Sequence, residues 1–225
     1  VSTDTRNISQ NAFFFALKGP NFNANAFAAQ ALESGASYAV IDEVVQPMSD
    51  SFILVDNVLK TLQDLARFHR DYLGLPVVAL TGSNGKTTTK ELINAALQQH
   101  FKTIATIGNL NNHIGVPLTL LSMNSDTEVG VIEMGANHAT EIALLCSLAK
   151  PNVGYITNFG KAHLEGFGSE QGIIVAKSEL YDYLKANKGL IIMNSDDTKQ
   201  EKQVGCYSNT FSFSEYKQTS INIRL

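Results

Sequence analysis

The chain has 225 residues, of which 44% are hydrophobic and 17% charged, and it carries a net charge of −4. These values indicate an ordinary globular protein and argue against a disordered chain. No dense cluster of Lys and Arg is present, so no nucleic-acid partner is expected. No apolar run approaches the roughly 20 residues that cross a bilayer, and no signal peptide is visible. We therefore expect a cytoplasmic protein that does not insert into a membrane.

The first third of the chain alternates short apolar runs with helical spacing. Strands are expected at residues 12–17, 38–41 and 53–55, with a helix at 26–34. A longer helix is expected after Asp56 or Asn57, because apolar residues then recur on one helical face. It ends near Gly74 and Pro76, which punctuate the pattern. The sequence therefore predicts an N-terminal domain of residues 1–75 and a second domain of residues 76–225.

From Val77 the pattern becomes strand, loop and helix, repeated. Strands are expected at residues 77–80, 103–107, 129–133, 153–157 and 190–193, and helices at 87–100, 140–149 and 169–186. Nearly continuous apolar strands separated by helices predict a parallel sheet covered on both faces. Alternating apolar residues at 210–225 suggest antiparallel strands added at one edge. Because this pattern stops midway, we expect the chain to be a piece of a longer protein.

A glycine-containing loop joins the strand at residues 77–80 to the following helix. Its residues are Thr81, Gly82, Ser83, Asn84, Gly85, Lys86, Thr87 and Thr88. In such a loop the backbone N–H groups surround phosphates, the lysine reaches the β and γ oxygens, and a hydroxyl such as that of Thr87 binds Mg²⁺. Leu80 occupies the place of the first glycine of the usual pattern. The alternative is a strand-to-helix turn with a surface lysine, but the strand and helix context favours a site for ATP and Mg²⁺.

Polar residues also follow two other strands of the predicted sheet. Glu133 ends the strand at 129–133, where an isolated carboxylate is costly unless it holds a cation, so we interpret it as a Mg²⁺ ligand. Asn158 and His163 follow the strand at 153–157, and we count both as catalytic candidates. A single histidine is more often structural, and that alternative stays open for His163. Ligands bind beyond the carboxyl ends of strands in such sheets.

An asparagine-rich turn occupies residues 109–117. It contains Asn111 and Asn112 and precedes an expected helix. Asparagine clusters more often simply form turns. Lys177, within the predicted helix at 169–186, reads from periodicity alone as a solvated surface lysine.

Taken together, these motifs resemble the Mur ligases of cell-wall synthesis, over nearly the whole chain. The matching stretches are residues 4–6, 14–19, 81–89, 109–121, 133–138, 158, 162–169 and 177–179. Three departures from the family pattern affect local turn shape. Asn11 and Thr140 stand where the family often has glycine, and Asn23-Ala24-Asn25 stands where Asp-Gly-His is common.

The resemblance implies an α/β protein with a small N-terminal substrate domain, a P-loop parallel-sheet central domain and no C-terminal domain in this chain. It implies an ATP-dependent ligase that joins D-alanyl-D-alanine to UDP-N-acetylmuramoyl-tripeptide through an acyl phosphate, and that acts as a monomer. It also implies roles for individual residues. Mg²⁺ ligands would be Thr87, Glu133, His163 and a carbamylated Lys177; substrate ligands would be Asp4, Thr5, Arg6, Asn111 and Asn112; Lys86 and Lys177 would be catalytic.

Other functions remain open from the sequence. They are another Mur-type ligase, a folylpolyglutamate-synthase-like enzyme, a small-molecule kinase, and a nucleotide-binding module without chemistry. We expect the 225 residues alone to be inactive in ligation.

Overall fold

The computed structural model describes residues 1–47, 49–160 and 167–222. The chain forms two compact units, Val1–His69 and Arg70–Leu225. The expected domain boundary at residue 75 stays a prediction. No helix in the described part of the chain is both long and apolar enough to cross a membrane.

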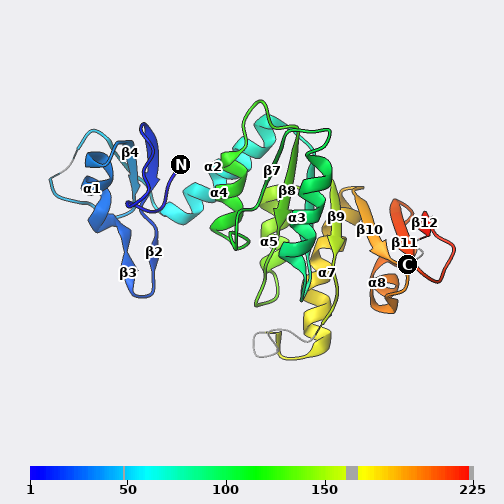
Figure 1. Cartoon of the computed structure of the whole chain (residues 1–225). Helices are drawn as coiled ribbons and strands as arrows, with labels where there is room; N and C mark the ends of the chain where they lie inside the picture. Colours follow the sequence, from blue (N-terminus) through cyan, green and yellow to red (C-terminus); the bar gives the residue numbers. More distant parts are fainter. Residues whose placement is uncertain (48, 161–166, 223–225) are drawn as a thin grey trace. The chain divides into compact units, whose positions relative to one another are not determined.

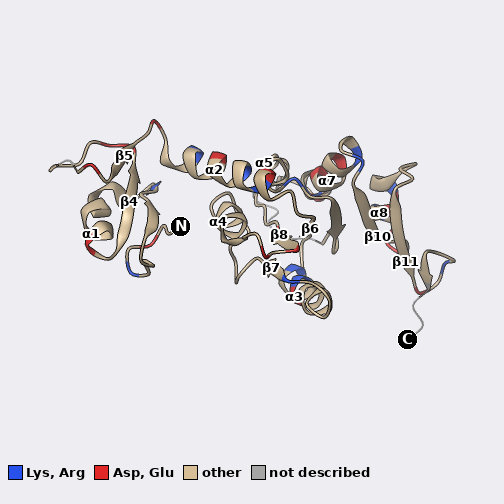
Figure 2. Ribbon diagram, turned by 90° about the horizontal axis from the view of Figure 1, so that it is seen from above, with Lys and Arg blue, Asp and Glu red and all other residues tan. Residues whose placement is uncertain are grey.

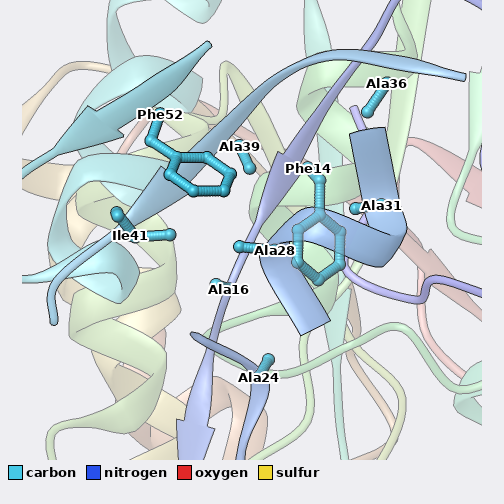
Figure 3. Packing of buried hydrophobic residues seen from close by; sticks show 9 residues of the cluster. All are labelled: Phe14, Ala16, Ala24, Ala28, Ala31, Ala36, Ala39, Ile41 and Phe52. Carbon is cyan, nitrogen blue, oxygen red and sulfur yellow. The ribbon is translucent and has the colours of Figure 1, made fainter. Parts of the chain in front are cut away.

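The first unit is a small α/β layer. Its parallel sheet has the order β1-β4-β5, with β1 at Ala12–Phe15, β4 at Ala36–Ile41 and β5 at Phe52–Leu54. A short antiparallel pair, β2 (Lys18–Gly19) and β3 (Phe22–Asn23), leads into the 3₁₀ helix η1 (Ala24–Phe27) and α1 (Ala28–Glu33). Phe14 and Phe52 lie among small alanine side chains between α1 and the sheet (Figure 3). The alanines allow this helix to approach the strands closely.

Two of the departures in this unit keep a defined local structure. Asn11 has φ of 63°, a left-handed conformation that asparagine tolerates better than most residues other than glycine. Asn25 is buried; its side chain accepts from the Asp42 N–H (3.0 Å) and donates to Asp42 Oδ1 (2.9 Å). Asn11 therefore forms the turn in place of the common glycine, and Asn25, in place of the common histidine, bonds to Asp42.

The helix α2 (Val58–Leu73) begins after Asn57, whose Oδ1 accepts the Lys60 N–H at 2.8 Å. This confirms the expected cap. The helix carries both signs of charge along its length (Figure 2). The division between the two units falls within it.

The second unit is built on a seven-stranded sheet of order β12-β11-β10-β9-β6-β8-β7. Its remaining elements are β6 Val77–Thr81, α3 Lys86–Leu97, β7 Thr103–Ala105, α4 Gly115–Ser122, β8 Val129–Glu133, α5 Glu141–Ala149, β9 Val153–Ile156, α7 Glu170–Ala186, β10 Leu190–Asn194, α8 Thr198–Val204, β11 Thr210–Ser214 and β12 Ile221–Asn222. All strand pairs in this sheet are parallel. Helix α3 covers one face, and α5 and α7 cover the other (Figures 1 and 2). The parallel α/β fold is therefore confirmed.

The expected antiparallel tail is wrong. β11 pairs in parallel with β10, and β12 pairs in parallel with β11. The reason is α8, a helix that the apolar pattern did not reveal, because it is polar along most of its length and begins at the Asp197 cap. A helical crossover returns the chain to the starting end of the sheet, so the next strand runs parallel to the previous one.

The strand order brings three strand ends together. β6 lies between β8 and β9, and the chain leaves β6 toward β7 on one side before returning to β9 on the other. This is the topological switch point at which ligands bind in open parallel sheets. The carboxyl ends of β6, β8 and β9 carry Thr81, Glu133 and Thr157-Asn158.

Candidate functional site

The phosphate loop lies between β6 and α3, as the sequence predicts. Gly82 has φ of 148°, and a Cβ added there would lie 1.9 Å from Thr157 Oγ1. Both the backbone conformation and the contact therefore require glycine. Gly85, with φ of 75°, precedes the first residue of α3, so the loop ends directly at the N-terminus of a helix. A helix N-terminus favours anions.

The residues after β9 hold this loop. The Ser83 N–H donates to Asn158 O (3.0 Å), and the Ser83 hydroxyl donates to Gly160 O (2.7 Å). Asn84 and Asn158 exchange two bonds, Asn84 N–H to Asn158 Oδ1 (3.3 Å) and Asn158 Nδ2 to Asn84 O (3.0 Å). The Asn158 side chain thus contacts the loop backbone. The residues after β9 therefore fix the conformation of the phosphate loop without a bound ligand.

Two lysines lie near each other at this loop. Lys86 Nζ donates to Gly82 O (3.0 Å) and Ser83 O (3.4 Å). Lys177, on α7, is 2% exposed, and its Nζ lies 5.7 Å from the centre of the Phe167 ring. Burial, with the charge of Lys86 as a second cause, lowers the pKa of Lys177 to about 8. The interpretation of Lys177 as a solvated surface lysine is therefore wrong.

Glu133 is 1% exposed at the end of β8. Its Oε1 accepts from Asn111 Nδ2 at 2.7 Å, and its N–H donates to Thr106 Oγ1 at 3.0 Å. Within the described residues, Glu133 Oε2 and the neighbouring Thr81 Oγ1 are buried without a hydrogen-bond partner. A carboxylate oxygen left in this way is costly unless a charged or polar ligand reaches it.

The asparagine-rich turn lines a pocket beside this carboxylate. The pocket has a volume of about 450 Å³, and Lys86, Asn111 and Asn112 all contribute to its wall. Asn112 Oδ1 accepts the Ile114 and Gly115 N–H groups at 3.0 and 2.9 Å, which begins α4. Residues far apart in sequence therefore share one polar cavity at the switch point.

The expected cation ligands are only partly placed. His163 lies outside the described residues. Glu133 and Lys177 are buried, whereas Thr87 and Thr88 are exposed on the first turn of α3. No group of three His, Cys, Asp or Glu side chains suited to a metal ion occurs in the part of the chain that the structure describes.

The first unit has a pocket of its own, with a volume of about 640 Å³. Asp4, Thr5 and Arg6 line it, together with the rings of Phe22 and Phe27, which stack with centroids 5.6 Å apart. Arg6 Nε and Nη2 donate to the Asp4 carboxylate at 2.9 and 2.7 Å, and this lowers the pKa of Asp4 to about 2. The pocket combines an aromatic wall with a charged rim.

Several contributing residues were not foreseen from sequence. Thr157 donates through its hydroxyl to Asn84 O (2.7 Å), and Gly135 lies against the Asn111 side chain. Lys90 is 1% exposed and donates to Thr106 O at 2.5 Å. Thr157 could have been found, since it lies next to Asn158 directly after β9. Lys90 gives no local signal, because a lysine one turn after Lys86 looks like a surface residue.

Comparison with known proteins agrees with this arrangement. The family described as Mur ligase middle domain matches residues 80–224. The chain is 42% identical over 213 residues to UDP-N-acetylmuramoyl-tripeptide--D-alanyl-D-alanine ligase of Bacillus subtilis, covering 94% of this chain and 46% of that protein. It is 39% identical over 231 residues to the Escherichia coli protein of the same name, covering 99% and 51%. The chain thus spans about half the length of the curated relatives it matches.

Solved structures give the same result. MurF from Acinetobacter baumannii superposes with a TM-score of 0.85 at 35% identity, covering 96% of this chain and 48% of that one. MurF ligase from Thermotoga maritima in complex with ADP has a TM-score of 0.85 at 34% identity, covering 96% and 50%. With its middle-domain match extending from the phosphate loop to the last parallel strands, the chain belongs to the Mur ligase family.

Proposed function

We propose that this chain belongs to an enzyme that uses ATP to join D-alanyl-D-alanine to UDP-N-acetylmuramoyl-tripeptide in peptidoglycan precursor synthesis. The observation that carries the proposal is the meeting of three strand ends around Lys86, in a chain that is 39–42% identical to two ligases of that name. An acyl phosphate would be formed on the tripeptide carboxylate and then attacked by the dipeptide amine. Such an enzyme would act in the cytoplasm, and we propose that it is a monomer.

The nucleotide phosphates would bind to the loop from Thr81 to Thr88. Its N–H groups and the α3 N-terminus favour phosphate oxygens, and Lys86 would exchange its bonds to Gly82 O and Ser83 O for bonds to phosphate. Phosphoryl transfer depends mainly on position and charge neutralisation. The two hydrogen bonds between Asn84 and Asn158 support this role, because they fix the loop before phosphate binds.

Two buried oxygens at the ends of β6 and β8 support a Mg²⁺ site. Glu133 Oε2 and Thr81 Oγ1 are buried oxygens without a partner among the described residues, and oxygen is the ligand type that this cation takes. We propose that Glu133 and Thr87 hold the cation, with His163 and a carbamylated Lys177 as further ligands. A bound Mg²⁺ would neutralise charge on the phosphates. The lowered pKa of Lys177 supports carbamylation, which requires a neutral amine.

Each unit carries its own candidate residues for substrate binding. The aromatic and charged pocket of Asp4, Thr5 and Arg6 suits a uridine nucleotide, since a base can stack on a phenylalanine and Arg6 can bind phosphate. We propose that Asn112, which lines the polar pocket together with Lys86, contacts the peptide end of the substrate.

The test is an assay of the complete protein that contains this sequence, with ATP, UDP-N-acetylmuramoyl-tripeptide and D-alanyl-D-alanine. Amide product with stoichiometric phosphate is expected. Product only with a single amino acid would assign it to another Mur-type ligase, and product only with folate and glutamate to the folylpolyglutamate type. Binding of ATP without phosphate release would indicate that the protein is a nucleotide-binding module without chemistry. We propose that the 225 residues alone form no product, and pentapeptide from this chain by itself would contradict that.

A further inference from the structure

Two hydrogen bonds hold Glu133, one at its backbone and one at its carboxylate. Its backbone N–H donates to Thr106 Oγ1, and Asn111 Nδ2 donates to Oε1 at 2.7 Å. Oε2 alone has no partner within the described residues. The terminal torsion of a glutamate is otherwise broad, so without such a bond the plane of the carboxylate could rotate. The Asn111 amide therefore fixes the orientation of the carboxylate and leaves one oxygen available.

Asn111 is itself held in a close-fitting space. The Gly135 N–H donates to Asn111 O at 2.7 Å. A Cβ added to Gly135 would lie 2.7 Å from Asn111 Oδ1 and 2.8 Å from its Cγ. Gly135 is not among the glycines with positive φ. Glycine is needed here for space and not for backbone conformation, and the space is filled by the Asn111 amide.

The backbone side of this arrangement connects to the phosphate loop. Thr106, whose hydroxyl accepts the Glu133 N–H, also accepts from the buried Lys90 through its carbonyl. Lys90 lies one helical turn after Lys86 on α3. Helix α3, which begins at the phosphate loop, is therefore linked through Thr106 to the backbone of Glu133 at the end of β8.

We propose that Asn111 is a positioning residue for the cation site, acting through Glu133, and that Gly135 provides the space its amide requires. This inference rests on the proposed function, because it takes Glu133 to be a cation ligand. It reassigns Asn111 from substrate ligand to support. Its Nδ2 donates to Glu133, and residues that orient metal ligands typically account for about 10–100-fold in metal affinity.

The experiment measures binding of Mn²⁺ to this chain by electron paramagnetic resonance, with ADP present. The variants are Asn111→Ala, Gly135→Ala, the double variant and Glu133→Gln. Gly19→Ala is the matched control, since nothing lies within 4 Å of the added methyl group. ADP affinity without divalent cation and the thermal unfolding midpoint are measured in parallel.

We expect Mn²⁺ affinity to fall about 10–100-fold in Asn111→Ala and about tenfold in Gly135→Ala. ADP affinity without the cation should stay within about twofold, a separation that general damage to the fold would not give. The double variant should lose no more than Asn111→Ala alone, because both changes remove the same contact. Gly135→Ala also tests the inference if Asn111→Ala fails to fold, because it disturbs the Asn111 amide without replacing the asparagine.

The outcomes separate the inference from the function on which it rests. Parent chain that binds no Mn²⁺, or Glu133→Gln that binds it as well as the parent, would overturn the cation site itself. Loss in Glu133→Gln, with Asn111→Ala and Gly135→Ala both within twofold of the parent, would overturn the positioning role alone. Additive losses in the double variant would also overturn it.

Discussion

The charged side chains of the two pockets have different kinds of partner. At the phosphate loop the charged groups are held by neutral partners. Lys86 donates to carbonyl oxygens, Lys177 is buried near a ring, and Glu133 accepts from an amide. No acidic side chain of the described residues pairs with either lysine. In the pocket of the first unit, the exposed side chains of Asp4 and Arg6 form an ion pair.

The difference indicates what each region requires of a ligand. A buried charge without an opposite partner costs stability, and that cost is recovered when a charged ligand arrives. An exposed pair costs little and contributes little. Substitutions that remove buried charges in the loop region are therefore expected to lower function strongly and to raise stability. Substitutions in the first pocket are expected to change function and stability only slightly.

The largest expected effect is on turnover in Lys86→Met. In the complete enzyme the reaction rate should fall about 10³-fold, because charge on the transferring phosphoryl group loses its partner. Unfolding by denaturant should change little. Lys102→Met, which removes an exposed lysine of the same unit, is the control. An unchanged kcat/KM for Lys86→Met would return Lys86 to the surface-lysine interpretation.

A stability gain is expected for Lys177→Met, even though ligation should be lost. The pKa of Lys177 is lowered from 10.5 to about 8 in the folded chain, so the unfolded chain binds the proton more tightly. The loss of stability caused by burying the charged Lys177 side chain is complete below pH 8. It decreases between pH 8 and 10.5 and is absent above pH 10.5. The variant should therefore be more stable by about 1–3 kcal/mol at pH 7 and equal to the parent near pH 11.

Denaturant titrations in CO₂-free buffer measure this, since a carbamate would remove the ammonium. A variant that is less stable at pH 7 would show that the buried lysine contributes favourable contacts instead. Lys188→Met, an exposed lysine just after α7, should show no such pH dependence.

A smaller gain is expected for Glu133→Gln. The change removes a buried charge whose Oε2 lacks a partner in the described structure, while an amide oxygen can still accept from Asn111. The free energy of unfolding should rise by about 1 kcal/mol in the absence of divalent cations. With Mn²⁺ and ADP present the order should reverse, because only the parent gains stability from the ion. A loss of stability in both conditions would contradict this account.

The smallest effect is expected for Arg6→Ala. The Arg6 and Asp4 side chains are 88% and 45% exposed, so unfolding should change within experimental error. Affinity for uridine diphosphate should fall by no more than about tenfold, since the stacking surface remains. Isothermal titration measures the affinity, and a stability loss as large as those at the phosphate loop would break the comparison.

Local sequence was sufficient for much of this fold. The apolar run at 129–133 matches β8, and the bounds of the phosphate loop follow from a strand, two glycines and a helix. The family pattern also located two special turns. Asn11 and Thr140, which replace common glycines, have φ of 63° and 70°. The backbone keeps the left-handed conformation at a cost of roughly 1–2 kcal/mol for Thr140, whose N–H donates to Glu179 Oε1 at 2.6 Å.

Tertiary structure alone decided the rest. The burial of Lys177 depends on how α7 packs on the sheet and on α5, and a lysine in a mixed helical pattern gives no sign of it. The direction of β11 depended on a polar helix, α8, whose apolar signal is weak. The bonds from Asn158 to Asn84 and from Asn111 to Glu133 join residues that are 74 and 22 positions apart. Periodicity records which face a residue takes within its own element, whereas such contacts are set by strand order, which the crossover helices establish only when the whole sheet forms.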